Sequence, residues 1–171
     1  SRASSGRRGA PPRGRSPILG LGTAVFQPGY GVDGSGLTAD NPHALLRTAV
    51  ERGVRYIDTA VGYGASEHWL SKLSELLNVH EVRLCTKLSA DAMLEDPSAA
   101  VGKLGHSPLD TLLVHSANCA TLRDSRVAER IIALKEEGWV RRCGASTYGV
   151  DDACLALEQA WCDVVQVEFS V

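Results

Sequence analysis

The chain has 171 residues, a formal net charge of -2, 44% hydrophobic residues and 22% charged residues. This composition is typical of a globular protein and excludes collagen-like, mucin-like and coiled-coil structures. The near-neutral charge argues against a nucleic-acid partner. No apolar run approaches the ~20 residues that span a membrane, so no membrane partner is expected either.

The first 17 residues form a segment of their own. They carry five Arg and no acidic residue, among Ser, Gly, Pro and Ala. Such a segment buries too little apolar surface to offset the entropy of ordering it, so we expect a disordered basic tail over residues 1–17. We favour a plain tail and a cytoplasmic protein. An Arg- and Ser-rich stretch without acids also resembles part of a transit peptide, which would place the protein in a mitochondrion or plastid.

Short apolar runs alternate with amphipathic helical patterns along the rest of the chain. The runs are mostly continuous, as in parallel strands that are buried on both faces. They predict strands over residues 18–26, 54–60, 82–88, 111–116, 140–146 and 164–170. The helical patterns begin at the capping residues Asn41, Ser66, Asp96, Asp124 and Asp151. Serial βα repetition predicts a parallel α/β fold, either a doubly wound sheet or a (β/α)8 barrel.

The loop after the first predicted strand contains a Gly-x-Gly-x-x-Gly pattern over residues 29–34, with Glu51 where a ribose-binding acid would lie. The dinucleotide-binding fingerprint requires this loop to open a helix directly. Here residues 35–40 separate the pattern from the next helix. We therefore favour a Gly-rich βα loop over a Rossmann site.

The five Cys residues are odd in number and none are spaced Cys-x-x-Cys. This spacing predicts neither a zinc site nor any other metal site. Cys85 and Cys143 lie inside predicted strands, which indicates small buried hydrophobic residues in a reducing compartment.

Polar side chains follow the predicted strands at their carboxyl ends. Asp58 ends the second strand, Tyr63 lies in the loop after it, Lys87 ends the third strand and His115 the fourth. In a barrel these ends form one face, so we expect the four side chains to converge. A nearby ammonium lowers the pKa of a tyrosine, and a histidine can hydrogen-bond a carbonyl oxygen. The set therefore suits carbonyl reduction, which needs a proton donor at that oxygen.

The motifs around these residues resemble those of the aldo-keto reductase family. The resemblance covers residues 18–171, and the combination of motifs is specific although any single one is weak. The matching segments are ILGLGT at 18–23, YIDTAVGYGASE at 56–67, TK at 86–87, LDTLLVH at 109–115, GWVRRCGAS at 138–146 and VQVEFS at 165–170.

This resemblance implies an oxidoreductase that transfers a hydride between NADP(H), less often NAD(H), and a small carbonyl or alcohol substrate such as an aldehyde, ketone or sugar. Tyr63 would be the general acid, Lys87 would lower its pKa, Asp58 would pair with Lys87, and His115 would orient the carbonyl. The implied cofactor contacts are Gly22, Thr23, Asp58, Ser146, Thr147 and Gln166. Thr147 departs from the family, which usually has Asn there, and lacks the paired donor and acceptor of an amide.

A complete (β/α)8 barrel needs about 250 residues, so we expect an incomplete barrel of six strands over residues 18–171. We interpret the sequence as a fragment or a truncated gene product. The alternative is a partial barrel that a second chain completes. Two functional alternatives also remain: a non-catalytic or cofactor-sensing relative, and an inactive fragment.

Overall fold

The computed structural model describes residues 20–27, 29–30 and 41–168. The tail predicted over residues 1–17 and most of the Gly-rich loop lie outside these residues. Six parallel strands form one sheet in the order β1 to β6. A doubly wound sheet reverses its strand order part-way, and this sheet does not. The strands are β1 (Leu21–Gly22), β2 (Tyr56–Asp58), β3 (Arg83–Leu88), β4 (Leu109–Val114), β5 (Val140–Thr147) and β6 (Val164–Val167).

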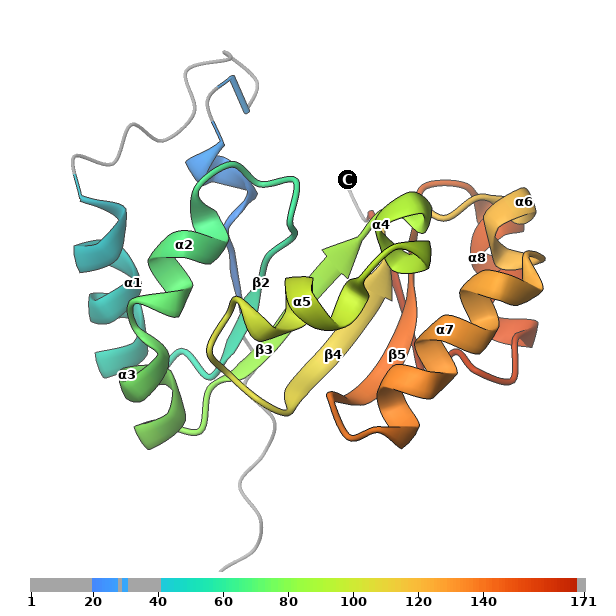
Figure 1. The fold of residues 1–171 in the computed structure, drawn as a ribbon. Coiled ribbons are helices and arrows are strands. Elements are labelled where there is room, and N and C mark those ends of the chain that lie inside the picture. The colour runs from blue at the N-terminus through green and yellow to red at the C-terminus, as the bar shows by residue number, and fades with distance from the viewer. Residues whose placement is uncertain (1–19, 28, 31–40, 169–171) are drawn as a thin grey trace, which may run out of the picture.

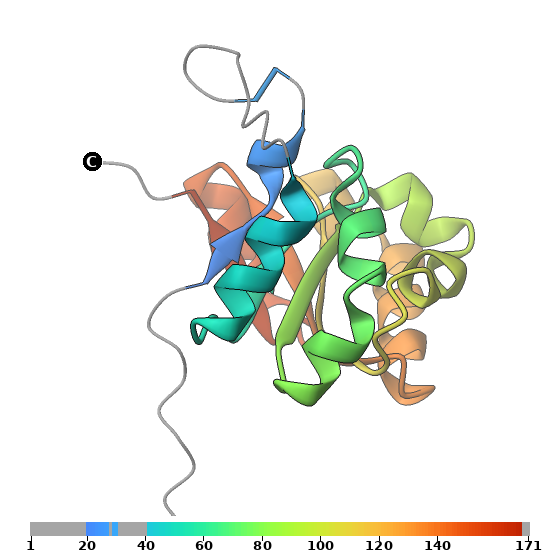
Figure 2. The same cartoon turned by 90° about the vertical axis from the view of Figure 1, so that its left-hand side faces the viewer.

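The sheet is strongly curved. Four strand spacings separate β2 from β6, which is about 19 Å in a flat sheet. Nevertheless, the Gln166 side-chain amide on β6 donates to Asp58 Oδ1 on β2 at 3.4 Å. The six strands therefore curl as in a (β/α)8 barrel, which confirms the predicted barrel class. Figures 1 and 2 show the curved sheet with helices along its outer side.

Most helices begin where the sequence supplies a capping side chain. Asn41 Oδ1 accepts from the Ala44 amide at 2.9 Å, and Asp124 Oδ1 accepts from the Arg126 amide at 3.0 Å. Such caps satisfy backbone donors that the first helical turn leaves free. The helices are the 3-10 helix η1 (Ala24–Phe26), α1 (Pro42–Glu51), α2 (Ser66–Ser71), α3 (Ser74–Val79), α4 (Ala90–Leu94), α5 (Pro97–Gly102), α6 (Cys119–Leu122), α7 (Ser125–Glu136) and α8 (Val150–Glu158).

The strand predicted over residues 18–26 is wrong at its carboxyl end. The Thr23 amide still donates to Asp58 O of the neighbouring strand, at 2.9 Å. Beyond this point the Phe26 and Gln27 amides donate to the carbonyls three residues back, those of Thr23 and Ala24, both at 3.0 Å. These local bonds replace the sheet ladder and form η1.

Two predicted helices also differ from the structure. The helix predicted from Ser66 is divided into α2 and α3, because the Leu73 amide donates to Leu70 O in a tight turn that brings Leu73 into the core. The last helix begins at Val150 behind Gly149, so Asp151 lies in its first turn rather than at its cap.

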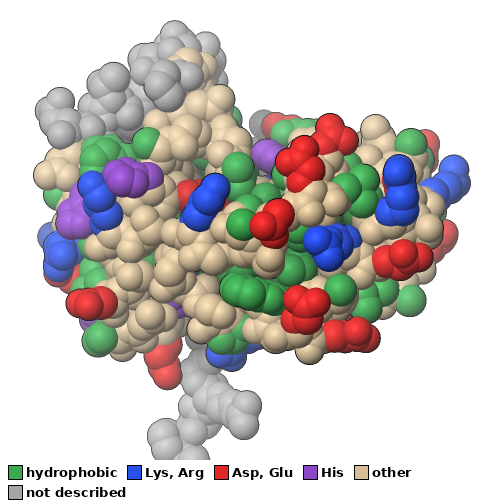
Figure 3. Space-filling view, in the orientation of Figure 1, with side chains coloured by type: hydrophobic (Ala, Val, Ile, Leu, Met, Phe, Trp, Pro, Cys, Tyr) green, Lys and Arg blue, Asp and Glu red, His purple; other side chains and the backbone are tan. Residues whose placement is uncertain are grey.

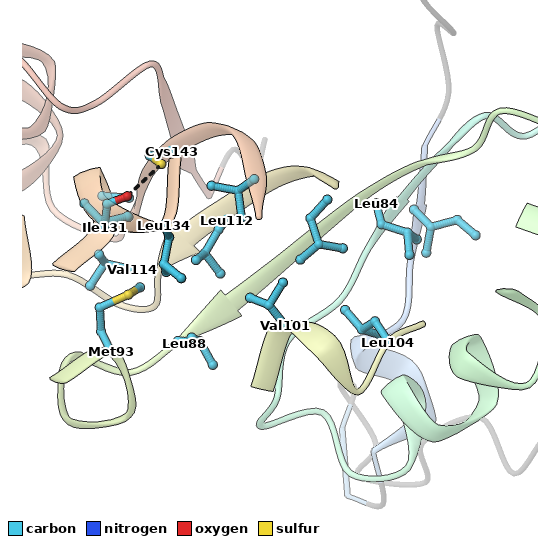
Figure 4. Packing of buried hydrophobic residues seen from close by; sticks show 14 of the residues in the cluster. Leu84, Leu88, Met93, Val101, Leu104, Leu112, Val114, Ile131, Leu134 and Cys143 are labelled. Atoms are coloured by element: carbon cyan, nitrogen blue, oxygen red, sulfur yellow. Dashed lines mark hydrogen bonds between the residues drawn. The ribbon is translucent and has the colours of Figure 1, made fainter. Parts of the chain in front are cut away.

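The main core lies between the sheet and the helices. Figure 4 shows Leu84 and Leu88 of β3 and Leu112 of β4 in this layer, together with Ile131 of α7. Cys143 of β5 belongs to the same layer, and its thiol donates to Ile131 O at 3.5 Å. Side chains alternate along a strand, so the residues between these core positions face the barrel interior. The alternation thereby places the side chains of the site.

The outer face in Figure 3 carries Lys, Arg, Asp and Glu side chains scattered among apolar ones. No helix in the described part of the chain is both long enough and apolar enough to cross a membrane.

Candidate active site

The carboxyl ends of the strands surround a cavity of about 340 Å³. Asp58 is the last residue of β2, Lys87 lies one residue before the end of β3, and His115 follows β4 directly. The cavity is lined by Gly22, Ala24, Tyr30, Asp58, Tyr63, Lys87, His115, Ser146, Thr147, Tyr148, Gln166, Val167 and Glu168. Parallel strands all end at one edge of their sheet, so residues more than a hundred positions apart meet here.

Lys87 is the most deeply buried charge of the site, with 2% of its surface exposed. A buried ammonium is costly unless it is paired and hydrogen-bonded. Its Nζ donates to Asp58 Oδ2 at 2.6 Å and to Thr59 O at 3.0 Å, and lies 3.5 Å from Tyr63 Oη. The three donor hydrogens of the ammonium therefore all have partners within the protein.

Tyr63 is held above Lys87 by the loop between β2 and α2. Its ring centroid lies 5.1 Å from Lys87 Nζ, and its amide donates to Ala60 O at 2.9 Å. Burial raises the pKa of Tyr63 above its ordinary value, and the ammonium of Lys87 opposes that rise without overcoming it. Lys87 thus acts on the phenol in the direction that the sequence predicts, while the net pKa of Tyr63 is raised.

His115 packs edge-on against Tyr63, with ring centroids 5.8 Å apart and ring planes at 82°. Burial and the nearby charge of Lys87 lower the pKa of His115. The imidazole is therefore neutral at physiological pH, and one ring N–H is available as a hydrogen-bond donor.

Strands β5 and β6 contribute polar groups to the opposite wall. Ser146 Oγ accepts from the Ser116 amide at 3.0 Å. Two buried atoms of this wall, Thr147 Oγ1 and Gln166 Oε1, have no hydrogen-bond partner among the described residues. Buried polar groups rarely remain unpaired, so these two atoms indicate a place for a polar ligand group.

The structure brings together all but one of the predicted site residues. Thr23 lies behind the wall, where its hydroxyl donates to Asp58 O at 3.1 Å and lies within hydrogen-bond distance of Thr59 Oγ1, at 2.9 Å. Sequence reasoning missed Tyr30 and Tyr148, which are exposed at the mouth of the cavity. The signal for Tyr148 was its place directly after the Ser146-Thr147 pair at the end of β5.

The structure is therefore part of a (β/α)8 barrel with an Asp, a Tyr, a Lys and a His gathered at the carboxyl ends of its strands. The sequence matches the model of the aldo/keto reductase family over residues 18–171, and the chain belongs to this family. The predicted family is thereby confirmed.

Solved structures show the same fold. An aldo-keto reductase from Klebsiella pneumoniae in complex with NADPH is 26% identical, with a TM-score of 0.70 over 90% of this chain and 54% of that chain. A Pseudomonas aeruginosa protein assigned to the aldo-keto reductases is 29% identical, with a TM-score of 0.69 over 86% of this chain and 61% of that chain. An aldo/keto reductase from Brucella melitensis is 26% identical, with a TM-score of 0.66 over 90% and 59% of the two chains.

The chain spans 54–61% of the length of these three neighbours. A comparison with curated proteins gives no match. Within the described ranges, no group of three or more His, Cys, Asp or Glu side chains is placed to hold a metal ion.

Proposed function

We propose that the protein is an oxidoreductase that transfers a hydride between a nicotinamide cofactor, NADP(H) or less often NAD(H), and a small carbonyl or alcohol substrate. Aldehydes, ketones and sugars are the substrate classes. The observation that carries the proposal is the buried Lys87 ammonium, which is paired with Asp58 and lies 3.5 Å from the phenol of Tyr63 at the cavity wall. Family membership and the NADPH complex of the Klebsiella neighbour support the choice of cofactor.

The residues of the cavity fit such a cofactor. The carboxamide of a nicotinamide carries both donors and an acceptor, which match the unpaired Thr147 Oγ1 and Gln166 Oε1. Ser146 and Asp58 line the same cavity, and Gly22 leaves its part of the wall free of a side chain. When it is bound, the nicotinamide supplies or accepts the hydride.

The side chains of the protein would supply the proton that the substrate oxygen needs. Tyr63, protonated at neutral pH because its pKa is raised, donates its proton to the substrate oxygen as negative charge develops there. Lys87 stabilises the phenolate that remains, and Asp58 keeps the ammonium in place. The neutral His115 donates a hydrogen bond that orients the carbonyl.

The test is NADPH oxidation by the purified protein with an aromatic aldehyde, compared with the variants Tyr63→Phe and Tyr56→Phe. Tyr63→Phe removes the proton donor, and we expect a loss of rate of about a hundredfold or more. Tyr56→Phe makes the same chemical change on β2, outside the cavity lining, and should retain activity.

Equal rates in wild type and Tyr63→Phe would contradict the tyrosine acid. NADPH binding without turnover would favour the cofactor-sensing alternative. A non-cooperative thermal melt of the wild type would favour an inactive fragment.

A further inference from the structure

Three hydroxyl side chains behind the cavity wall are completely buried. Thr23, Thr59 and Ser66 are each 0% exposed, and none of them lines the cavity. They come from the end of β1, the end of β2 and the start of α2. We call these three residues the hydroxyl belt.

The hydroxyl belt contacts the backbone on both sides of the loop between β2 and α2, which carries Tyr63. Ser66 Oγ lies 2.7 Å from Tyr63 O and 3.1 Å from Thr23 O, so its hydrogen is shared between the two carbonyls. Thr23 Oγ1 in turn contacts Asp58 O at 3.1 Å and Thr59 Oγ1 at 2.9 Å. The belt therefore ties the carbonyls of Tyr63, Thr23 and Asp58 into one hydrogen-bonded unit.

The same unit reaches the ammonium. Lys87 Nζ donates to Thr59 O at 3.0 Å, and the Thr59 hydroxyl contacts the Thr23 hydroxyl. Thr59 therefore links the ammonium to the hydroxyl belt. Figure 1 shows β1 and η1, in blue, beside the start of α2, where these bonds join the elements. The same hydrogen-bonded unit therefore holds both the Tyr63 backbone and the Lys87 ammonium.

We propose that Thr23, Thr59 and Ser66 are positioning residues that set the distance between Tyr63 Oη and Lys87 Nζ. Tyr63 stands in a loop, and loops are more mobile than the elements that they connect. A displacement of about 1 Å at a reacting group can lower a rate by about a hundredfold. A buried hydroxyl that holds the Tyr63 peptide prevents such a displacement without touching the substrate.

This inference also changes the role expected for Thr23. The family resemblance implies that Thr23 contacts the cofactor, but its hydroxyl and its amide both contact the end of β2. Its function in the belt needs no ligand. Only the kinetic part of the test below rests on the proposed function.

The test uses two pairs of variants in the full chain, each with one variant that removes a contact and one control. Ser66→Ala and Thr59→Val each remove one belt hydroxyl, and Thr59→Val keeps the shape of the side chain. Thr59→Ser keeps the hydroxyl and should rescue. Ser71→Ala is the matched control for Ser66→Ala, because Ser71 Oγ donates to His68 O at 2.9 Å on the same helix but at an exposed position.

The first readout does not require activity. The protein is labelled with ring-carbon-13 tyrosine, and the NMR signal of Tyr63 is assigned by its loss in Tyr63→Phe. We expect this signal to shift or broaden in Ser66→Ala and Thr59→Val and to stay unchanged in Ser71→Ala and Thr59→Ser. The second readout is kinetic: kcat should fall about ten- to a hundredfold in the two loss variants, with KM for NADPH unchanged.

An unchanged Tyr63 signal in a folded loss variant would overturn the proposal. If one loss variant fails to fold, the other decides, and failure of both would make the hydroxyls merely structural and would also overturn it. A wild type without turnover would contradict the proposed function alone, because the Tyr63 signal still tests the belt.

Discussion

Lys87 determines the electrostatics of the site, because its ammonium lies close to both the Tyr63 phenol and the Asp58 carboxylate. Its charge lowers the pKa of Tyr63 and of His115, while burial acts on the two rings in opposite directions. Burial disfavours the charged form of each group, so it raises the pKa of the phenol and lowers the pKa of the imidazole. Both rings are therefore neutral over a wide range of pH.

The substitution Lys87→Met should raise the pKa of Tyr63 further, because it removes the nearby charge that opposes the effect of burial. Methionine fills a similar volume, and the Asp58 that it leaves behind retains Gln166 as a partner. Tyrosinate absorbance during an alkaline titration measures the change, with Tyr63→Phe identifying the signal. Lys72→Met removes a lysine that lies over the Trp69 ring instead and serves as the control. A Tyr63 pKa that is unchanged in Lys87→Met would contradict this account.

The pH dependence of the proposed carbonyl reduction follows from Tyr63 and His115. Tyr63 must be protonated to act as an acid, and its raised pKa keeps it protonated up to and beyond pH 10.0. His115, with a pKa below 6.5, stays neutral above that value. We therefore expect kcat for reduction to be flat between these limits and to fall at higher pH. A decline that begins well below pH 10.0 would show that the phenol is more acidic than its environment indicates.

Most catalytic candidates can be predicted from the sequence, because each follows an apolar run that forms a strand. Asp58, Lys87 and His115 are recognisable in this way. Thr59 and Ser66 are not, because a buried hydroxyl and a solvated one look alike in a sequence. Only the fold shows that both are enclosed behind the cavity wall.

At the scale of elements, the pairing of β5 with β6 depends on a close approach between the two backbones at Gly144. A Cβ added to Gly144 of β5 would lie 1.8 Å from Val164 O and 3.0 Å from a Leu113 methyl group. The first contact is with backbone and cannot be relieved by a change of rotamer. Gly144 therefore allows β6 to pair with β5 and brings Gln166 to the cavity.

The substitution Gly144→Ala should lower the free energy of unfolding by about 3 kcal/mol, at the upper end of what overpacking costs. Gly102→Ala is the matched control. It lies at the end of α5, where the nearest atom to a new Cβ is 3.9 Å away, and it should stabilise the protein by about 0.5–1 kcal/mol. Urea unfolding measures both changes, and hydrogen exchange should show loss of protection in β6 for Gly144→Ala. Equal stability of the two variants would contradict the close approach.

Element boundaries are less predictable than the elements themselves. Strands β3 and β5 end within one residue of the predicted positions, because each is long and most of its residues are buried. The residues Ala24–Phe26 are just as apolar but form a 3-10 helix, because local hydrogen bonds replace a neighbouring strand. The short helix α4 was missed, although the Ser89 hydroxyl that caps it was a usable signal.

At the scale of the whole molecule, burial of two thiols makes stability depend on pH. Burial raises the pKa of Cys85 and of Cys143 from 9.0 to about 12. The unfolded chain loses these protons near pH 9.0, whereas the folded chain keeps them. Stability is therefore fully present below pH 9.0 and is lost as the pH rises toward 12, by up to about 1.4 kcal/mol per pH unit for each thiol.

Urea unfolding at one pH unit below and one above 9.0 checks this dependence. Cys143→Ala should reduce the slope, because it removes one of the two buried thiols. Cys154→Ala removes an exposed thiol and should leave the slope unchanged. An identical slope in the wild type and in Cys143→Ala would contradict the assignment.

Within the described residues, β1 and β6 each pair with a single strand, on one side only. Unpaired edges favour association with other chains, so a second chain that completes the barrel stays a hypothesis. Two measurements test this hypothesis: sedimentation, which gives the oligomeric state of the purified protein, and the affinity of the protein for NADPH. Tight NADPH binding by a monomer would contradict it.

The separation between the hydroxyl belt and the mouth of the cavity has a consequence for engineering. Tyr30 and Tyr148 stand at the mouth, and Tyr148 is 74% exposed, whereas the belt lies entirely behind the wall. A library that randomises these two tyrosines would sample new cavity shapes while Tyr63, the proposed proton donor, keeps its support. Directed evolution could therefore vary the residues at the mouth of the cavity, whereas it would have to keep the residues of the hydroxyl belt.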